Sequence, residues 1–443
     1  MTSTTNDGIV EVRITDRQRL LAVFASCFGW SLDLFDLFIL LYVAPVIGKL
    51  FFPSDHPTLS LAAVYASFTV TLLMRPVGSA IFGSYADRHG RKAAMFTAVS
   101  GVGLVTASFG LLPTLAQAGF IAPIAFLLLR LVQGIFVGGV VATTHTVGTE
   151  SVPAKWRGAV SGLVGGGGAG LGALLASLSF FVASSIFSGP DFEVWGWRVM
   201  FFSGIISSVL GLFVFKFLEE SPVWLAARAR RAATGSVVKS PLGQLFSGAS
   251  RNVLLVNLLV TAGAGSAYYV TSGYLPSFLK LINKIPNSSA SMILIGSALV
   301  ATISGPLIGF ISDLIGRRST FIAVGLPALV LLPLIYLAMA KTQDIQTIAL
   351  YAFAISFFGN AVLAPVPIFL NERFPTALRA SGTGLSWNIG FALGGMMPTF
   401  VSLASGETAN IPSVLAIFCV GACALFVVGA IAAGETKGTK LSD

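Results

Sequence analysis

The chain has 443 residues, of which 55% are hydrophobic and 10% charged, and its formal net charge is +9. Soluble globular chains carry about 25% charged residues, so the 27 basic and 18 acidic residues here are too few to cover a water-exposed surface. Soluble enzymes, disordered chains and disulfide frameworks are therefore excluded, and an integral membrane protein is predicted.

A polar segment at 1–19 lacks the apolar core of a cleaved signal peptide, so it is predicted to be a cytoplasmic tail. Twelve apolar stretches follow, each long enough for a bilayer core, which needs about 20 helical residues. Long runs without alternation favour helices over strands. The twelve predicted spans are 20–50, 59–84, 92–113, 119–149, 158–187, 196–218, 251–282, 289–312, 319–340, 345–371, 380–404 and 411–434.

The predicted fold class is all-α integral membrane, with 12 transmembrane helices in two pseudo-symmetric six-helix halves. The halves are 20–218 and 251–434, a cytoplasmic linker occupies 219–250, and a C-terminal tail occupies 435–443. With both tails inside, 20 of the 27 basic residues fall on the cytoplasmic side, as the positive-inside rule requires. The positive charge is thus explained by topology and lipid contact, and no nucleic-acid partner is predicted.

Two motifs repeat between the halves at nearly one offset, which indicates duplication. The segment G-S-Y-A-D-R-H-G-R-K at 83–92 corresponds to G-F-I-S-D-L-I-G-R-R at 309–318. The pattern E-x-x-P-x-x-x-R begins at Glu150 and again at Glu372. The offsets are 226 and 222 residues.

The first span contains two carboxylates, Asp33 and Asp36, which are three residues apart and so share one helical face. Charges inside a membrane are costly unless they are paired or hydrated. Two close carboxylates in a low dielectric do not both ionise easily, so they are candidate proton carriers. The alternative is a permanent salt bridge to Arg75 or Arg130. Arg75 has a planar fork that can hold a carboxylate, or it packs beside Pro76.

The loop at 83–92 is similar to the signature loop of the major facilitator superfamily, and the resemblance covers essentially the whole chain. It implies a transporter that works by alternating access, and not an enzyme. It also implies that the repeated loops form a conformational latch, the alternative being a basic loop that only sets topology. The latch residues would be Gly83, Asp87, Arg88, Gly90, Arg91, Glu150, Arg157, Asp313, Arg317, Glu372 and Arg379.

Within the superfamily the chain resembles the carboxylate:proton symporters, namely the sialate and lactate/pyruvate group, with a likeness to the α-ketoglutarate permease group. The resemblance is carried by G-W-S-L-D-L-F-D-L-F at 29–38, M-R-P-V-G at 74–78, E-S-V-P-A-K-W-R-G at 150–158 and E-S-P-V-W at 220–224. It implies that Arg75 binds an anionic substrate. Span 4 departs from the group, because Val140 stands where a carboxylate is usual.

The R-x-x-Q-G pattern at Arg130 resembles the superfamily motif of span 4, whose arginine is linked to proton transfer. Asp33 or Asp36 is its expected counter-ion, and Arg130 is also a candidate second contact for the substrate. His145 is a candidate replacement for the missing carboxylate of span 4, and a structural histidine bonded to nearby threonines is the alternative.

The resemblance implies that spans 1, 4, 7 and 10 line the substrate cavity. Aromatic and amide side chains there suit an organic acid, although packing or interface roles are the alternative for each. The remaining candidates for substrate binding, two of them from span 11, are Asn257, Tyr268, Tyr269, Asn360, Trp387 and Asn388.

We therefore predict a proton-coupled symporter of a small organic carboxylate, with lactate or pyruvate favoured, in a plasma membrane such as a bacterial inner membrane. The alternatives are a drug or metabolite:proton antiporter and a symporter of sialate, aromatic acids or dicarboxylates, whereas a receptor or membrane enzyme is disfavoured. The expected partners are the organic anion, the proton and the lipid bilayer, and a monomer is expected. Cys27, Cys419 and Cys423 lie in apolar runs and predict reduced thiols, with no metal site and no cofactor.

Overall fold

The computed structural model describes residues 16–89, 91–150, 152–216, 248–374 and 376–439. Within these ranges, the side chains at 83–84, 86–89, 91–92, 141–147, 149–150, 154, 207, 210, 214–216, 248–250 and 376–381 also lie outside the description. Every regular element in the described ranges is helical. The predicted linker at 219–250 falls mostly in the gap at 217–247, and the next helix begins at Gly248.

The N-terminal half, as the name is used below, comprises the helices up to Lys216. Its elements are α1 (Asp16–Phe51), α2 (Pro57–His89), α3 (Arg91–Phe109), α4 (Leu115–Ala118), α5 (Ile121–Glu150), η1 (Ala154–Trp156), α6 (Arg157–Gly162), η2 (Leu163–Gly167), α7 (Gly168–Ile186), η3 (Phe192–Gly196), α8 (Trp197–Phe202) and α9 (Gly204–Lys216).

The C-terminal half comprises the helices from Gly248 onwards. Its elements are α12 (Gly248–Tyr268), η4 (Tyr269–Gly273), α13 (Leu275–Leu281), α14 (Asn287–Ile315), α15 (Arg317–Met339), α16 (Ile345–Leu363), α17 (Val366–Arg373), α18 (Thr376–Gly395), α19 (Met397–Ser405), η5 (Thr408–Asn410) and α20 (Ile411–Ala432).

Ten helical stretches in the described ranges are long and apolar enough to cross a membrane. The predicted span at 92–113 corresponds to the shorter apolar helix α3, and the predicted span at 380–404 corresponds to α18 and α19. The predicted stretch at 345–371 is not one helix, because α16 ends at Leu363 and α17 begins at Val366. Pro365 and Pro367 lack the backbone N–H that a continuous helix needs, which explains the break.

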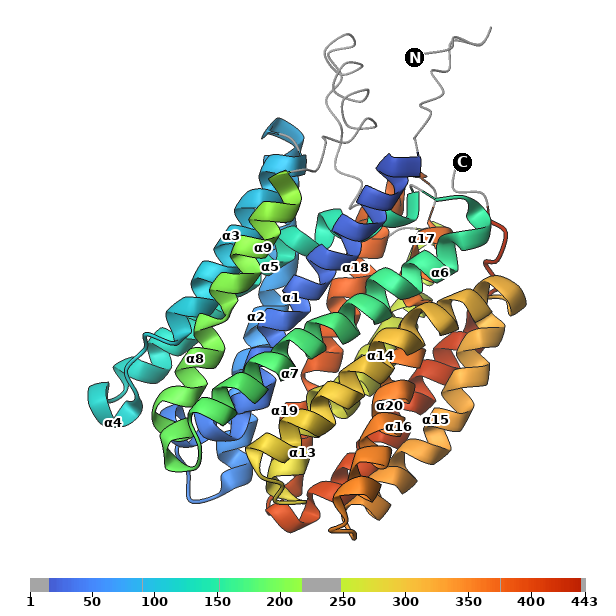
Figure 1. Ribbon diagram of the computed structural model, residues 1–443. Coiled ribbons are helices and arrows are strands. Elements are labelled where there is room, and N and C mark those ends of the chain that lie inside the picture. Colours follow the sequence, from blue (N-terminus) through green and yellow to red (C-terminus); the bar gives the residue numbers. More distant parts are fainter. Residues whose placement is uncertain (1–15, 90, 151, 217–247, 375, 440–443) are drawn as a thin grey trace, which may run out of the picture.

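The helices run between two ends of the molecule, as Figure 1 shows. We call the end where α1 begins and where α6 and α17 lie the upper end, and the end with α4 and α13 the lower end. The two halves meet along two seams, with α7 against α14 and α2 against α18 and α19.

The seam between η2, α7 and α14 depends on glycine. A Cβ atom at Gly305 of α14 would overlap the backbone of Gly166 and Gly167, and one at Gly162 would overlap Gly305. Residues without a side chain therefore let the two halves approach to backbone contact. Gly166 and Gly167, which belong to the π-helical turn η2, account in this way for part of the glycine run at 165–168, whereas Gly168 packs against Cys27 and Trp30 of α1.

Candidate functional site

A buried ion pair joins α1 and α2 inside the N-terminal half. Asp33 Oδ2 lies 3.4 Å from Arg75 Nη2, and the two side chains are 1% and 4% exposed. Both carboxylate oxygens of Asp33, and Nε and Nη2 of Arg75, have no hydrogen-bond partner. A well-formed bond between these groups is about 2.7–2.9 Å long. Asp33 and Arg75 thus attract each other, but both side chains keep hydrogen-bonding atoms that a ligand could use.

Asp36 lies almost one turn further along α1 and is also buried. The helix is surrounded by protein along most of its length, so both aspartates are placed inside the molecule and not against lipid. This agrees with the predicted shared face, and the role of either group in proton coupling stays a prediction.

An aromatic cluster drawn from both halves reaches the pair through Tyr269, and we call Trp30, Phe68, Tyr269, Trp387 and Phe391 the aromatic wall. Tyr269 interacts electrostatically with both Asp33 and Arg75. Its ring contacts Phe68 at a centroid distance of 5.3 Å and Phe391 at 6.2 Å. Trp387 stacks on Phe391 at 3.9 Å and meets Trp30 at 5.3 Å. The wall is thus continuous from α1 and α2 to η4 and α18.

Amide groups on the C-terminal half add unpartnered polar atoms. Both side-chain polar atoms of Asn257, Nε1 of Trp387 and Oδ1 of Asn388 are buried without a hydrogen bond. Their helices, α12 and α18, pack against each other. Buried polar atoms are nearly always bonded in proteins, so such orphans mark a place where a ligand or water is expected.

A small cavity of about 20 Å³ lies between the halves and is lined by residues of α1, α7, α12, α14 and α16. Tyr42 of α1 and Tyr268 of α12 line it together with Ser272, Ser297 and Asn360. Oγ of both serines and Oδ1 of Asn360 are buried and unpartnered. Tyr268 also interacts electrostatically with Asp33. The volume suits about one water molecule, so this cavity extends the polar centre by a single hydrogen-bonded site.

The contacts of Arg130 are a glutamine and two phenyl rings of its own half. Its Nη1 donates to Gln133 Oε1 at 2.7 Å, and its guanidinium lies over the rings of Phe109 and Phe126, 4.3 and 5.1 Å from their centroids. Of the two expected counter-ions, Asp33 is paired with Arg75 instead, and a pairing of Arg130 with Asp36 stays a prediction. The contacts of Arg130 favour a packing role inside the N-terminal half, and its part in coupling or substrate binding stays a prediction.

The second loop copy forms a charged network at the upper end. Arg317 donates to Asp313 Oδ1 at 2.7 Å and, through Nη2 and Nε, to the two oxygens of Glu372 at 3.0 and 3.2 Å. Asp313 also accepts the backbone N–H groups of Gly158 and Ala159 at 3.0 and 2.9 Å. These amides belong to the first turn of α6, so a carboxylate of one half caps a helix of the other.

Sequence reasoning missed two members of this network, which lie in the predicted tail. Glu435 accepts the backbone N–H groups of Arg317 and Arg318, at 2.8 and 3.1 Å, and so caps α15. Thr436 donates to Glu372 Oε2 at 2.7 Å. The one signal in the sequence is an acidic residue directly after the last predicted span.

Most of the first loop copy cannot be placed. The side chains of Gly83, Asp87, Arg88, Gly90, Arg91, Glu150 and Arg379, and of the coupling candidate His145, lie outside the described residues. Arg157 is described and opens α6, the helix that Asp313 caps. The structure therefore describes the contacts of the C-terminal copy, and the role of either copy as a latch stays a prediction.

Comparisons with known proteins agree with this geometry. Residues 19–397 match the family model for the Major Facilitator Superfamily. The Escherichia coli inner membrane metabolite transport protein YhjE is 29% identical over 411 residues, covering 90% of this chain and 91% of the relative. A putative proline/betaine transporter of Staphylococcus haemolyticus is also 29% identical, over 95% of this chain and 88% of its own. The Salmonella typhimurium proline/betaine transporter is 27% identical over 88% and 79%.

Solved structures confirm the predicted fold class. The proton:xylose symporter XylE bound to a bromo-deoxyglucose aligns with a TM-score of 0.73, covering 97% of this chain and 98% of that one, at 16% identity. A crystal structure of a D-xylose-proton symporter aligns with a TM-score of 0.67 at 18% identity, over 92% and 97%. At these identities the likeness shows the fold alone.

Proposed function

The chain belongs to the major facilitator superfamily of secondary transporters, and from that premise we propose that it carries a small zwitterionic carboxylate, of the betaine or proline type, together with a proton. This keeps the predicted carboxylate but replaces lactate or pyruvate as the favoured substrate. The names of the relatives point to proline and betaine. The observation that carries the proposal is the loosely bonded Asp33–Arg75 pair beside the aromatic wall.

A zwitterion fits this pair because it presents both charges. Its carboxylate would take the two unpartnered nitrogens of Arg75, since a guanidinium holds a carboxylate with two bonds. Its cationic nitrogen would face Asp33 and the rings of the aromatic wall, which attract cations. Inserting a neutral zwitterion leaves the buried charge unchanged. An anion such as lactate would add a negative charge to a site that already contains Asp33 and Asp36.

The proton would be carried by the two aspartates of α1. They are buried close together, where two negative charges are mutually unfavourable. Protonation of Asp36 would remove the repulsion between the two carboxylates, so that Asp33 stays ionised for the cationic nitrogen of the substrate while Arg75 takes its carboxylate. Substrate release would restore the Asp33–Arg75 ion pair and favour loss of the proton from Asp36, so that binding of substrate and proton are coupled.

The upper end is proposed to face the cytoplasm of a bacterial cell, in accordance with the distribution of basic residues. The Arg317 network and the amides of α6 would then hold the halves together on the cytoplasmic side. Breaking and reforming that contact while the halves rock about the central pair gives alternating access.

Binding can be tested on the purified protein by thermal shift, because a ligand that binds the folded state raises Tm. Proline and glycine betaine should raise Tm, and lactate should not. Arg75→Gln should abolish the rise, whereas the exposed control Glu407→Gln should retain it. A rise with lactate alone, or an undiminished rise in Arg75→Gln, would overturn the proposal.

A further inference from the structure

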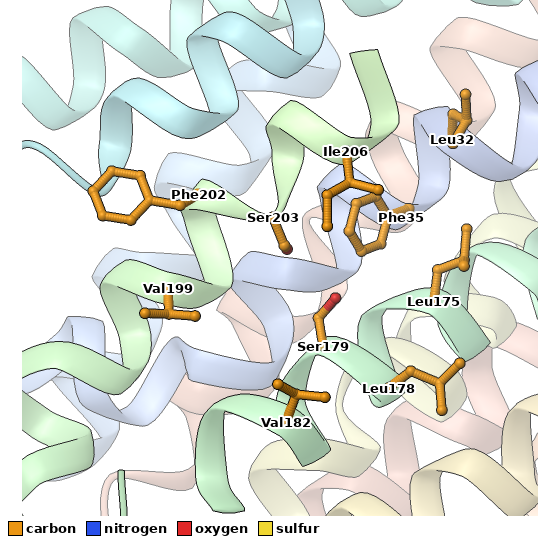
Figure 2. A pocket seen from close by; sticks show the side chains of 10 residues that line it. All are labelled: Leu32, Phe35, Leu175, Leu178, Ser179, Val182, Val199, Phe202, Ser203 and Ile206. Carbon is orange, nitrogen blue, oxygen red and sulfur yellow. The ribbon is translucent and has the colours of Figure 1, made fainter. Parts of the chain in front are cut away.

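An apolar hollow of about 440 Å³ lies on the N-terminal half between α1, α7, α8 and α9. Figure 2 shows its walls, which include Phe35, Leu178, Val182, Phe202 and Ile206. Leu178, Val182 and Ile206 are exposed at 43%, 51% and 56%. Asp33 and Arg75 are not among its lining residues, so the hollow is separate from the proposed transport site.

A second hollow, of about 410 Å³, continues from the first toward the lower end. Phe202 lines both, so the two share a wall. Along η3, α8 and α9 the residues of the second hollow, from 193 to 198, precede those of the first, from 199 to 206. The second hollow therefore lies nearer the end of the span, and its lining is more polar, with Gln117, Thr114 and Trp195.

Arg198 is the positive charge of the second hollow that has no acidic partner among the described residues. Glu193 forms an ion pair of 2.7 Å with Lys49. Arg198 is bonded only to neutral groups, because its Nη1 donates to the carbonyls of Gly110 and Leu112 at 2.7 and 2.8 Å. These bonds fix the half-buried guanidinium at the hollow and leave its other donors for an anion.

We propose that the two hollows form one binding site for a phospholipid of the bilayer leaflet at the lower end. An acyl chain lies in the apolar hollow, and the phosphodiester is held by Arg198. The order of the two linings matches an amphiphile in a bilayer, with hydrocarbon deeper and the headgroup at the end of the span. Trp195, which is 56% exposed, belongs to the residue type that concentrates at that level.

The site would reinforce a contact between α7 and α8 that already exists beside the hollow. The chain would lie between α7 on one side and α8 and α9 on the other, against α1, which carries Asp33. A bound lipid would therefore stabilise the N-terminal half.

The test is native mass spectrometry of the delipidated full-length protein titrated with phosphatidylglycerol. Ser179→Trp should fill the apolar hollow and reduce the occupancy of the first bound lipid at least fivefold. Arg198→Gln should reduce it similarly, and should leave binding of diacylglycerol, which lacks the phosphate, unchanged. The matched controls are Val428→Trp, on the exposed face of α20, and Lys341→Gln, both of which should bind as the parent does.

Size-exclusion chromatography separates a loss of binding from a loss of folding, and only monodisperse variants are compared. If Ser179→Trp and Arg198→Gln both bind phosphatidylglycerol like their controls, the site is disproved. If Arg198→Gln weakens diacylglycerol as much as phosphatidylglycerol, the assignment of the phosphate to Arg198 is overturned.

Discussion

At the scale of single residues, two buried arginines of the N-terminal half differ in whether a carboxylate faces them. Arg130 is bonded to Gln133 and lies over two phenyl rings, and its Nε and Nη2 have no bond. Arg75 has the same two nitrogens without a bond, but it also forms an ion pair of 3.4 Å with Asp33. A buried charge with few bonds lowers the stability of the folded protein. Such a charge is expected in a binding site, where a ligand completes its bonds.

The Asp33–Arg75 pair is expected to behave non-additively in stability. Asp33→Asn leaves the Arg75 charge buried and uncompensated, which typically costs about 3–5 kcal/mol. The double variant Asp33→Asn/Arg75→Gln removes both charges and should lower Tm less than the two single variants do in sum. Thermal unfolding of the four proteins in one detergent gives the comparison, and strictly additive shifts would contradict a direct interaction.

The sequence predicted which residues are buried charges, but it did not predict their partners. Asp33, Asp36 and Arg75 stand out because a membrane excludes charge, and that follows from composition alone. Whether Asp33 meets Arg75 or Arg130 depends on how α1, α2 and α5 pack, and each pairing was equally consistent with the spacing. The aromatic wall was missed in part for the same reason, since Phe68 and Phe391 resemble any other apolar residue of a span.

At the scale of elements, apolar run length was enough to locate the spans, whereas internal breaks needed the structure. The stretch from 251 to 282 contains α12, the π-helical turn η4 and α13. The turn contains Tyr269 and ends one residue before Tyr274, so the irregularity lies where the C-terminal half contributes to the aromatic wall. The length of an apolar run gives no indication of a π-helical turn within it.

The close crossing of η2 and α14 should not tolerate a side chain. Gly305→Leu places four carbons where the backbones of Gly166 and Gly167 already lie, so the halves must separate or the helices bend. Overpacking of this kind typically costs about 1–3 kcal/mol or more. Gly421→Leu on α20 is the control, since nothing lies within 4 Å of a Cβ at that position. We expect a marked fall in Tm for the first variant and little change for the second.

The cap that Glu435 forms on α15 should depend on pH. Burial alone would raise the pKa of Glu435, but backbone N–H groups of Lys437, Arg317, Thr436 and Arg318 outweigh it and hold the pKa below its ordinary value of 4.5. Because the pKa is lower in the folded chain, the stabilisation is complete above the ordinary value and is lost as the pH falls through the folded value.

Glu435→Gln should therefore lower Tm at neutral pH, and the difference from the parent protein should shrink below about pH 4. Thermal unfolding across a pH series measures this. A difference that stays constant down to the lowest pH would show that the carboxylate charge has no part in the cap.

At the scale of the whole molecule, the duplicated loops at 83–92 and 309–318 predicted a contact between the two halves. Asp313 caps α6 across the seam, and Ser161 Oγ accepts the N–H of Ile368 at 3.1 Å nearby. The sequence could propose a latch because the loop is duplicated, but the partner of Asp313 lies 155 residues away and follows only from the fold.

Removal of this cap should favour opening of the upper end. Asp313→Ala deprives α6 of its acceptor and Arg317 of one of its carboxylates. A cysteine introduced at Ser161, which is fully buried, should then react faster with a maleimide by about fivefold or more, the lower range of typical conformational coupling. Asp344→Ala at the exposed start of α16 is the control. Equal labelling rates in both variants would mean that the cap does not hold the halves together.

The central claim is that the buried pair selects a zwitterion and couples it to a proton, and uptake into proteoliposomes tests it most directly. With an acidic exterior, labelled proline or glycine betaine should accumulate, labelled lactate should not, and Asp33→Asn should abolish accumulation. Accumulation of lactate without either zwitterion, or zwitterion uptake that is indifferent to the pH gradient and to Asp33→Asn, would contradict it.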